Sequence, residues 1–416
     1  MPEANWDIVV AGAGAAGLLA AIRAAEAGRR TLLLEKNRKP GVKILMSGGT
    51  RCNITHATDN RGIVEAFGRP GQFLHSALAA LSVDETVALF ESEGVSTKVE
   101  ETGKIFPVSN KASDVLEALL RRFRRSGATL ALGEPLLGVE RTQAGFTIRT
   151  SVRILTAGRA VLTTGGQSYP GSGTTGDGYV FAASFGHTIV PPRPALVPIR
   201  VANPWVAELR GITLPDVSVR ILEADKRLAE RRGSLLFAHF GLSGPVILDV
   251  SRVVSGHPQP NMLTLGIDVL PQLREAELDE YLRKATLDSP KKQLAGILPE
   301  QLPRRLAETL LVQAGLPADR KAAGLSRNDR TRLVQQIKRL QLSITGTLGF
   351  GKAEVTAGGV VLDEIDSRTL GSKLVPDLFV AGELLDLDGP IGGYNFQAAF
   401  STGWLAGAAA ADDRGR

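Results

Sequence analysis

Three glycines near the start of the chain have the spacing Gly-x-Gly-x-x-Gly, at Gly12, Gly14 and Gly17. An apolar run over residues 7–10 precedes them and an alanine-rich stretch follows, so we expect a strand, a tight turn and a helix. Gly12 permits the turn, Gly14 lets the backbone approach phosphate groups, and Gly17 lets the helix pack closely on the sheet. Unpaired N–H groups at the start of that helix would bind a diphosphate, and the pattern therefore predicts a dinucleotide site.

An acidic residue follows this pattern at the distance that a dinucleotide site requires. A second apolar run, residues 31–34, ends in Glu35, which lies 18 residues beyond Gly17. A carboxylate at this spacing reaches the ribose hydroxyls, and its charge repels a 2′-phosphate. Residues 12–35 thus favour FAD or NAD over NADP, and they do not choose between FAD and NAD.

Later parts of the chain favour FAD. A loop rich in glycine and hydrogen-bond donors runs over residues 36–55, whereas an NAD domain usually returns quickly to a helix. Near the C-terminus, a strand leads into Ala-Gly-Glu, and a glycine turn over residues 389–395 opens a final helix of small residues. That turn would direct N–H donors at the pyrimidine edge of a flavin. The candidate cofactor-binding residues are Gly12, Gly14, Ala15, Ala16, Gly17, Glu35, Lys36, Ser47, Gly48, Arg51, Cys52, Asn53, Thr164, Gly165, Gly382, Glu383, Gly392, Gly393, Tyr394 and Asn395.

A series of motifs along the chain resembles one known family, the BaiN-like or YhiN-like FAD-dependent proteins, also called the aminoacetone oxidase family, within the glutathione-reductase-type flavoproteins. The motifs occur in order and cover nearly the whole chain: GAGAAG at 12–17, RCNIT at 51–55, KIFPVSNKASDV at 104–115, TTGGQSYPGSGTTGDGY at 163–179, HFGLSGP at 239–245, VTAGGV at 355–360 and AGELLDLDGPIGGYNFQAAFSTG at 381–403.

The resemblance implies a FAD-dependent oxidoreductase that moves a hydride to or from flavin N5 of a small-molecule substrate. One branch oxidises an amine or aminoketone with oxygen and releases hydrogen peroxide. The other takes electrons from NAD(P)H and reduces a carbon–carbon double bond conjugated to a carbonyl, as in a steroid-like enone. The sequence does not settle the choice between the two branches, and the lack of a separate nicotinamide-binding domain slightly favours the oxidase branch. A second Gly-x-Gly-x-x-Gly, residues 171–176, follows Tyr-Pro and not an apolar strand, so NAD(P)H would dock only transiently.

A cluster of prolines over residues 191–198 indicates a crossover between domains, because proline extends neither helices nor inner strands. We expect a mixed α/β fold, α+β overall, whose Rossmann-like FAD domain comes from both chain ends, residues 1–190 and 345–416. Residues 191–344 would form an inserted, β-rich, substrate-facing domain, with a helical annex over 274–342.

Candidates for side-chain catalysis are few, because a flavin carries the hydride chemistry itself. His239 lies in a loop-like motif of the insert, where an imidazole would exchange protons with the substrate or pin a domain interface. Tyr394 would contact flavin or substrate, or pack. The single cysteine, Cys52, has no resolving partner within the chain, so we interpret it as a buried residue of the cofactor loop. The histidines lack metal-ligand spacing, and no metal is expected.

The chain has a net charge of +6 and a pI near 9.5, which motivates an RNA-modifying flavoprotein as a third hypothesis. Its densest basic cluster, Arg121 to Arg125, ends an amphipathic helical pattern, and Phe123 is the single aromatic residue within that cluster. We therefore expect no nucleic acid partner. No apolar run approaches the roughly 18 to 20 residues of a membrane span. These features favour a cytoplasmic protein without membrane contact, as a monomer or homodimer.

Overall fold

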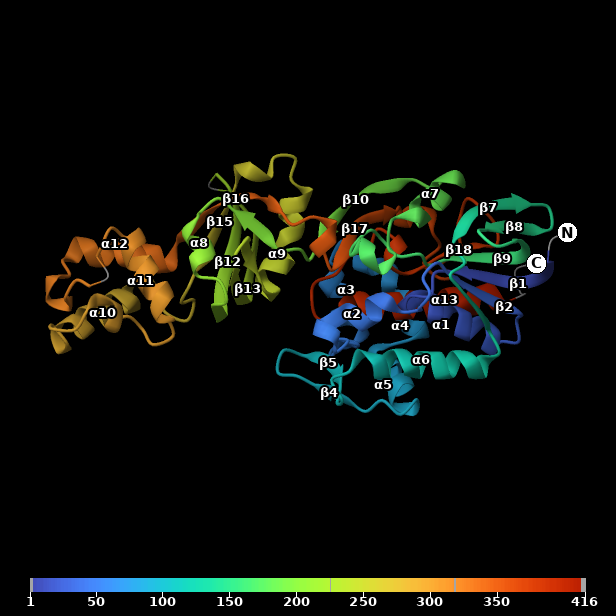
Figure 1. Ribbon diagram of the computed structural model, residues 1–416, viewed down its shortest axis with the longest axis horizontal. Helices are drawn as coiled ribbons and strands as arrows, with labels where there is room; N and C mark the ends of the chain where they lie inside the picture. The colour runs from blue at the N-terminus through green and yellow to red at the C-terminus, as the bar shows by residue number, and fades with distance from the viewer. Residues whose placement is uncertain (1–2, 225, 318, 413–416) are drawn as a thin grey trace. The chain divides into compact units, whose positions relative to one another are not determined.

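The structure of the protein is a computed structural model that describes residues 3–224, 226–317 and 319–412 (Figure 1). Contacts between Cα atoms divide the chain into two compact units. Unit 1 comprises Met1–Pro194 and Phe350–Arg416, and unit 2 comprises Ala195–Gly349. Both ends of the chain thus belong to one unit. That the units correspond to the predicted FAD and substrate domains stays a proposal.

Unit 1 is built on a seven-stranded sheet in the order β6-β2-β1-β9-β8-β7, with β18 also paired to β9. The strands are β1 (Glu3–Ala11), β2 (Thr31–Glu35), β6 (Thr129–Leu132), β7 (Leu136–Thr142), β8 (Gly145–Thr150), β9 (Ile154–Leu162) and β18 (Leu378–Val380). Neighbours are parallel except for the meander β7-β8-β9. Every residue of β2 is buried, as expected for a parallel strand covered on both faces.

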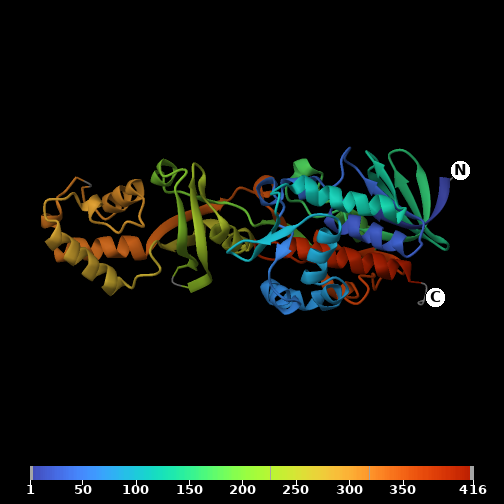
Figure 2. The same ribbon diagram turned by 90° about the horizontal axis from the view of Figure 1, so that it is seen from below.

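Three helices of unit 1 lie side by side, with α1 (Ala15–Glu26) between α6 (Ala112–Ser126) and α13 (Tyr394–Ala411) (Figure 2). The contact between α1 and α13 depends on small residues. A Cβ added to Gly403 would lie 2.2 Å from the carbonyl oxygen of Ala16, and one added to Gly407 would lie 2.2 Å from that of Ala20. The C-terminal helix is therefore packed directly on the helix that follows the first glycine turn.

Shorter elements complete unit 1. The helices are α2 (Val42–Thr50), α3 (Asn60–Phe67), α4 (His75–Ala80), α5 (Val83–Ser92) and α7 (Asp177–Ser184). One small sheet has the order β3 (Thr55–His56), β5 (Lys104–Pro107), β4 (Thr97–Val99), and a second pairs β10 (Ile189–Ala195) with β17 (Val355–Val360). The helix α2 differs from the predicted loop over 36–55. Its helical conformation breaks at Ser47, where ψ is 152°, and the break extends over Gly48 and Gly49, which have positive φ.

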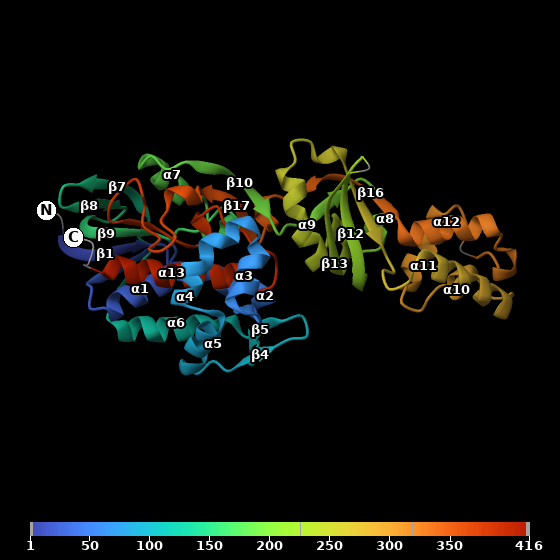
Figure 3. The same cartoon turned by 180° about the vertical axis from the view of Figure 1, so that it is seen from behind.

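Unit 2 contains a closed barrel in the order β11-β14-β13-β12-β15-β16 (Figures 1 and 3). Its strands are β11 (Ile199–Val201), β12 (Thr213–Glu223), β13 (Lys226–Ala238), β14 (Gly241–Ser243), β15 (Leu263–Asp268) and β16 (Leu340–Thr347), with α8 (Trp205–Glu208) and α9 (Pro245–Gly256) between them. Alternate residues of β12 are buried, which is typical of a sheet with one face in the core. Residues 340–342, predicted as helix, belong to strand β16 because they pair with β15.

Between β15 and β16 the chain forms the annex, which contains α10 (Glu275–Asp288), α11 (Arg304–Gln313) and α12 (Arg327–Lys338) (Figure 3). Its leucines share one buried cluster with the barrel. Among the described residues no single helix is long and apolar enough to cross a membrane, although the bent pair of segments 69–80 and 83–92 meets that length and composition together.

Candidate functional site

The first glycine turn lies between β1 and α1, as predicted. Gly12 has φ +103°, and an added Cβ there would lie 2.6 Å from the carbonyl oxygen of Thr163. A Cβ on Gly17 would lie 1.8 Å from the carbonyl oxygen of Gly12. Gly14, the N-cap of α1, differs, since a Cβ there would meet no atom within 4 Å. Two glycines thus serve the packing of the turn, whereas Gly14 faces open space at the start of a helix.

Glu35 joins this turn to the loop that follows β2. The side chain is buried, its Oε2 accepts a hydrogen bond from the Ala13 N–H at 2.8 Å, and its Oε1 accepts one from the Asn37 N–H at 2.8 Å. A carboxylate has about four acceptor positions. Glu35 therefore retains the capacity to accept a ribose hydroxyl while it holds the two loops together.

Lys36 and Asn37 connect the β2 loop to the second glycine-rich segment. Lys36 pairs with Asp177 and donates to the hydroxyl of Thr175 at 2.6 Å, and the Asn37 side-chain amide donates to the carbonyl of Ser172 at 2.9 Å. Residues 170–172 form a single 3-10 turn. In the structure, the second Gly-x-Gly-x-x-Gly therefore packs on the β2 loop.

Five predicted cofactor residues lie at the broken end of α2 or directly after it, namely Ser47, Gly48, Arg51, Cys52 and Asn53. A Cβ on Gly48 would lie 3.0 Å from the backbone nitrogen of Asn53 and 3.0 Å from the Phe106 ring. Glycine at this position therefore lets the backbone pack closely against both residues. The Arg51 guanidinium lies 4.0 Å from the centroid of the Phe106 ring and forms a 2.7 Å ion pair with Glu100. The contacts with Phe106 and Glu100 thus fix the orientation of the Arg51 side chain in this loop.

Cys52 is fully buried with φ +59°, and burial raises the pKa of its thiol to about 12 although Ser47 partly offsets that effect. A thiol with this pKa stays protonated at pH 8, and only the thiolate is a strong nucleophile. We expect iodoacetamide to alkylate native Cys52 at pH 8 at least ~100-fold more slowly than it alkylates free cysteine. Mass spectrometry measures the alkylation rate of Cys52 in the native protein in buffer, and in urea it measures the rate of the same cysteine once unfolding has made it accessible. Rapid labelling of the native protein would contradict this expectation.

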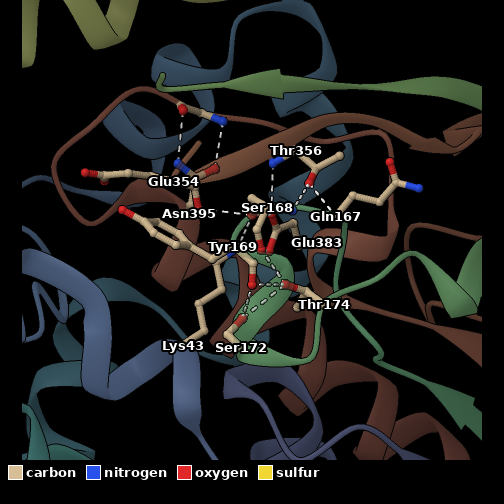
Figure 4. A network of polar contacts seen from close by, with 11 residues as sticks. Lys43, Gln167, Ser168, Tyr169, Ser172, Thr174, Glu354, Thr356, Glu383 and Asn395 are labelled. Atoms are coloured by element: carbon tan, nitrogen blue, oxygen red, sulfur yellow. Dashed lines mark hydrogen bonds and ion pairs between the residues drawn. The ribbon is translucent and has the colours of Figure 1, made fainter. Parts of the chain in front are cut away.

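A partly buried network connects four segments of unit 1 through Glu383 (Figure 4). Its Oε1 accepts hydrogen bonds from the Ser168 hydroxyl at 2.9 Å and the Thr356 N–H at 2.8 Å, and its Oε2 pairs with Lys43. The Lys43 ammonium also donates to Ser168 at 2.6 Å. Glu383 was predicted from its Ala-Gly-Glu motif. Lys43, Ser168 and Thr356 were missed, because nothing in their local sequence indicates a carboxylate partner.

A second cluster lies at the N-terminus of α13. The Asn395 side chain exchanges hydrogen bonds with Gly389, at 2.8 Å to its N–H and 3.0 Å to its carbonyl, and so closes the loop that precedes the helix. A Cβ on Gly393 would lie 2.4 Å from the Thr55 carbonyl. Only glycine therefore allows the start of α13 to lie against β3.

His56, at the end of β3, was not predicted as a site residue. Its ring stacks on that of Tyr394, with centroids 4.6 Å apart and planes at 21°. Its Nδ1–H donates to the Gly392 carbonyl at 3.0 Å, since a carbonyl oxygen only accepts. The histidine thus orients both the aromatic ring and the glycine turn. The signal in the sequence was a histidine directly after a motif residue, Thr55.

Two predicted cofactor residues carry buried polar atoms that lack a hydrogen-bond partner within the described residues, namely Asn53 Oδ1 and Thr164 Oγ1. An unsatisfied buried polar atom costs roughly 1–3 kcal/mol, so a polar ligand that supplies partners would be favoured here. Together with the open space at Gly14 and the intact Glu35, these atoms fit a dinucleotide. The binding role of each residue stays a proposal.

His239, the other catalytic candidate, lies in unit 2. Its side chain is exposed and meets the Phe240 ring edge-on, at 5.0 Å between centroids. Its catalytic role stays a prediction. No group of three or more histidine, cysteine, aspartate or glutamate side chains in the described part of the chain has the arrangement of a metal site.

Comparisons with known proteins identify the family of the chain. Residues 6–409 match the family described as "HI0933-like protein Rossmann domain". The chain is 34% identical over 403 residues to the ribosomal RNA dihydrouridine synthase of Escherichia coli strain K12, covering 96% of each protein. It is 33% identical over 412 residues to the 3-dehydro-bile acid delta(4,6)-reductase of Clostridium scindens, covering 97% of this chain and 99% of that enzyme.

Solved structures show the same fold at low identity. The 3-ketosteroid-delta4-(5alpha)-dehydrogenase of Rhodococcus jostii RHA1 superimposes with a TM-score of 0.52 at 17% identity, over 99% of this chain and 98% of that one. The open conformation of a flavocytochrome c3 fumarate reductase gives a TM-score of 0.51 at 18% identity, over 99% of this chain and 78% of that one. The predicted fold class and family resemblance are confirmed. The chain belongs to the HI0933-like family and is a FAD-dependent oxidoreductase with a Rossmann-type fold.

Proposed function

We propose that this protein reduces a carbon–carbon double bond conjugated to a carbonyl group. The observation that carries the proposal is the full-length similarity to two relatives whose names share this bond type. Dihydrouridine is uridine with a saturated carbon–carbon bond beside a carbonyl, and a delta(4,6)-reductase saturates ring double bonds of a 3-keto compound. The substrates named for these two relatives differ greatly in size, so what the two relatives share is the type of bond that they reduce.

The residues at the candidate site have distinct roles in this proposal. When bound, FAD supplies the hydride, with NAD(P)H as the external source of electrons. Gly14 and the start of α1 would bind the diphosphate, and Glu35 the ribose. The turn at Gly392 and Gly393 would direct N–H donors at the flavin ring. Reduction also requires a proton at the carbon next to the carbonyl, and the Tyr394 hydroxyl would supply it while His56 holds the ring in place.

Spectroscopy of the purified holoenzyme tests the reaction class. Without oxygen, NADH or NADPH is expected to bleach the flavin absorbance, and an enone or a uridine-containing RNA then restores it with formation of the saturated product. The amine oxidase branch stays the competing prediction. Bleaching by aminoacetone and not by a nicotinamide, with peroxide formed on readmission of air, would overturn the reductase proposal.

Replacement of Tyr394 tests the proton donor. Tyr394→Phe retains the stack on His56 and removes only the hydroxyl, so we expect reoxidation of the reduced flavin by the enone to slow roughly 100-fold. Reduction of the flavin by NAD(P)H needs no such proton and is expected to keep its rate. Stopped-flow absorbance measures the two half-reactions separately. Tyr281→Phe, at an exposed tyrosine of α10, is the matched control, and equal rates in both variants would exclude Tyr394 as the donor.

The remaining expectations also belong to this proposal. A small-molecule substrate, a cytoplasmic location and a monomeric or homodimeric state stay predictions. The predicted absence of a nucleic acid partner is untested, and the relatives named for ribosomal RNA, from Escherichia coli and Haemophilus influenzae, give a reason to test it.

A further inference from the structure

A serine, a histidine and a glutamate from distant parts of unit 1 meet in a chain of hydrogen bonds. His187 Nδ1 lies 3.0 Å from Oε2 of Glu364, and His187 Nε2 lies 2.8 Å from Oγ of Ser372. The histidine follows α7, the glutamate ends the 3-10 turn Leu362–Glu364, and the serine precedes β18. None of the three was predicted as a cofactor-binding or catalytic residue, so the tertiary structure alone reveals their arrangement.

Glu364 determines which nitrogen of His187 carries the proton. Burial by itself would raise the pKa of Glu364, but hydrogen bonds from Thr188 and His187 outweigh that effect and lower the pKa below its usual value. The carboxyl group is therefore ionised near neutral pH, where it only accepts hydrogen bonds. It accepts one from the Thr188 N–H at 2.9 Å and one from Nδ1–H of His187. In the neutral imidazole, Nε2 then carries no proton and can accept one.

The hydroxyl group of Ser372 is oriented by the backbone that follows it. Its Oγ accepts hydrogen bonds from the N–H groups of Leu374, at 3.1 Å, and Val375, at 2.9 Å. These two donors occupy the lone pairs of the oxygen, so the proton of the hydroxyl group is directed at Nε2 of His187. They also stabilise the negative charge that develops on Oγ as this proton leaves. A hydroxyl group beside a base that a carboxylate orients has the parts of an activated nucleophile.

Ser372 is accessible to solvent, whereas its base is not. The side chain of His187 is fully buried. Ser372 itself is half-buried, and the next two residues, Lys373 and Leu374, are exposed. A substrate would therefore reach Oγ of Ser372 before it reached the imidazole. The exposed side chain of Leu374 would contact a small apolar group on that substrate.

We propose that Ser372 and His187, with Glu364 as the positioning residue, form a second catalytic site that hydrolyses carboxylic esters of small acyl groups. Oγ of Ser372 attacks the carbonyl carbon of the ester while its proton passes to Nε2 of His187. The bond from that carbon to the alcohol oxygen then breaks, the alcohol takes the proton, and the serine is left acylated. Water attacks the acyl carbon and gives a proton to Nε2, and Oγ recovers that proton as its bond to the acyl carbon breaks. The reaction transfers no electrons, so this inference is independent of the proposed reduction.

Labelling of the native holoenzyme with a fluorophosphonate, which reacts with activated serines, tests the nucleophile. We expect one phosphonyl group on Ser372, located by mass spectrometry, to form at least ~100-fold faster than on the same serine in urea. The holoenzyme is also expected to hydrolyse p-nitrophenyl acetate, and Ser372→Ala to lose both reactions. Ser184→Ala is the matched control, since Ser184 is an exposed serine of α7 whose hydroxyl donates to the backbone carbonyl of Phe181. We expect the control to react as the wild type does.

Glu364→Gln tests the positioning residue. Glutamine is similar in size and can still accept from Nδ1–H, but it lacks the charge that stabilises the imidazolium, so we expect labelling of Ser372 to slow at least ~10-fold. Flavin absorbance and thermal unfolding establish that each variant remains folded. The proposal would be overturned if native Ser372 were not labelled, if it were labelled equally fast in urea, or if Glu364→Gln kept the wild-type rate. Equal ester hydrolysis by Ser372→Ala and Ser184→Ala would also overturn it, and the hydrogen bonds would then only join the three segments.

Discussion

Gly14→Ala is expected to weaken FAD binding by roughly 30-fold, or about 2 kcal/mol, without lowering the stability of the apoprotein. The reason is that a Cβ at Gly14 would meet no protein atom within 4 Å, and φ there is −84°, which alanine adopts without strain. In the proposed binding mode, the methyl group would fill the space that the diphosphate takes at the N-terminus of α1. Titration of the apoprotein with FAD, followed by flavin fluorescence, gives the affinity.

Two variants make this expectation specific. Gly296→Ala, in unit 2, also adds a methyl group that meets nothing within 4 Å, and it is expected to change neither FAD affinity nor stability. Gly17→Ala, by contrast, would place a Cβ 1.8 Å from the Gly12 carbonyl oxygen, so it is expected to destabilise the apoprotein itself. If Gly14→Ala bound FAD as tightly as the wild type, the diphosphate would not lie at this turn.

Glu383→Ala is expected to lower the free energy of unfolding of the apoprotein by about 2–3 kcal/mol. The change leaves the partly buried Lys43 ammonium without its carboxylate and removes the acceptor of the Thr356 N–H and the Ser168 hydroxyl. Because these three partners join three other segments of unit 1 to the segment of Glu383, we also expect weaker FAD binding. Urea unfolding of the apoprotein measures the first effect without contribution from the cofactor.

An exposed carboxylate of the same kind provides the control. Glu65 forms an i,i+4 pair with Arg61 on the surface of α3, and Glu65→Ala is expected to cost no more than about 0.5 kcal/mol. The double change Lys43→Ala and Glu383→Ala is expected to cost less than the sum of the single changes, by at least about 1 kcal/mol, if the two side chains interact in solution. Additive effects would show that the pair contributes little to the fold.

The two acidic residues of the site, Glu35 and Glu383, illustrate different degrees of predictability. Glu35 ends a strand at a fixed distance from a glycine turn, and its closest partners are the N–H groups of Ala13 and Asn37. Local geometry is enough to predict such an arrangement. Glu383 was recognised from its motif alone, and its ion pair with Lys43 spans 340 positions of sequence. Neither hydrophobic periodicity nor local secondary-structure propensity can predict a contact between residues so far apart in the sequence.

The sequence by itself determined the strand over residues 7–10 with the glycine turn and helix that follow it, the strand that ends in Glu35, and the glycine turn before the last helix. These features depend on short-range sterics and on hydrophobic periodicity, which the chain encodes within about 20 residues. The family resemblance was carried by the same local motifs. The proline cluster over residues 191–198 and the glycine-rich segments that return near residue 345 predicted that both chain ends form one FAD domain, which stays a prediction.

Only the tertiary structure decided which side chains meet. His56 stacks on Tyr394, and Lys43 pairs with Glu383. Two arginines of α6, Arg122 and Arg125, pair with carboxylates from outside that helix. The tertiary structure also converted residues 340–342 from predicted helix to strand, since pairing with β15 closes the barrel. The physical reason is common to all of these cases. Their energies come from groups that folding brings together, so local propensity, which acts on neighbouring residues, carries no information about them.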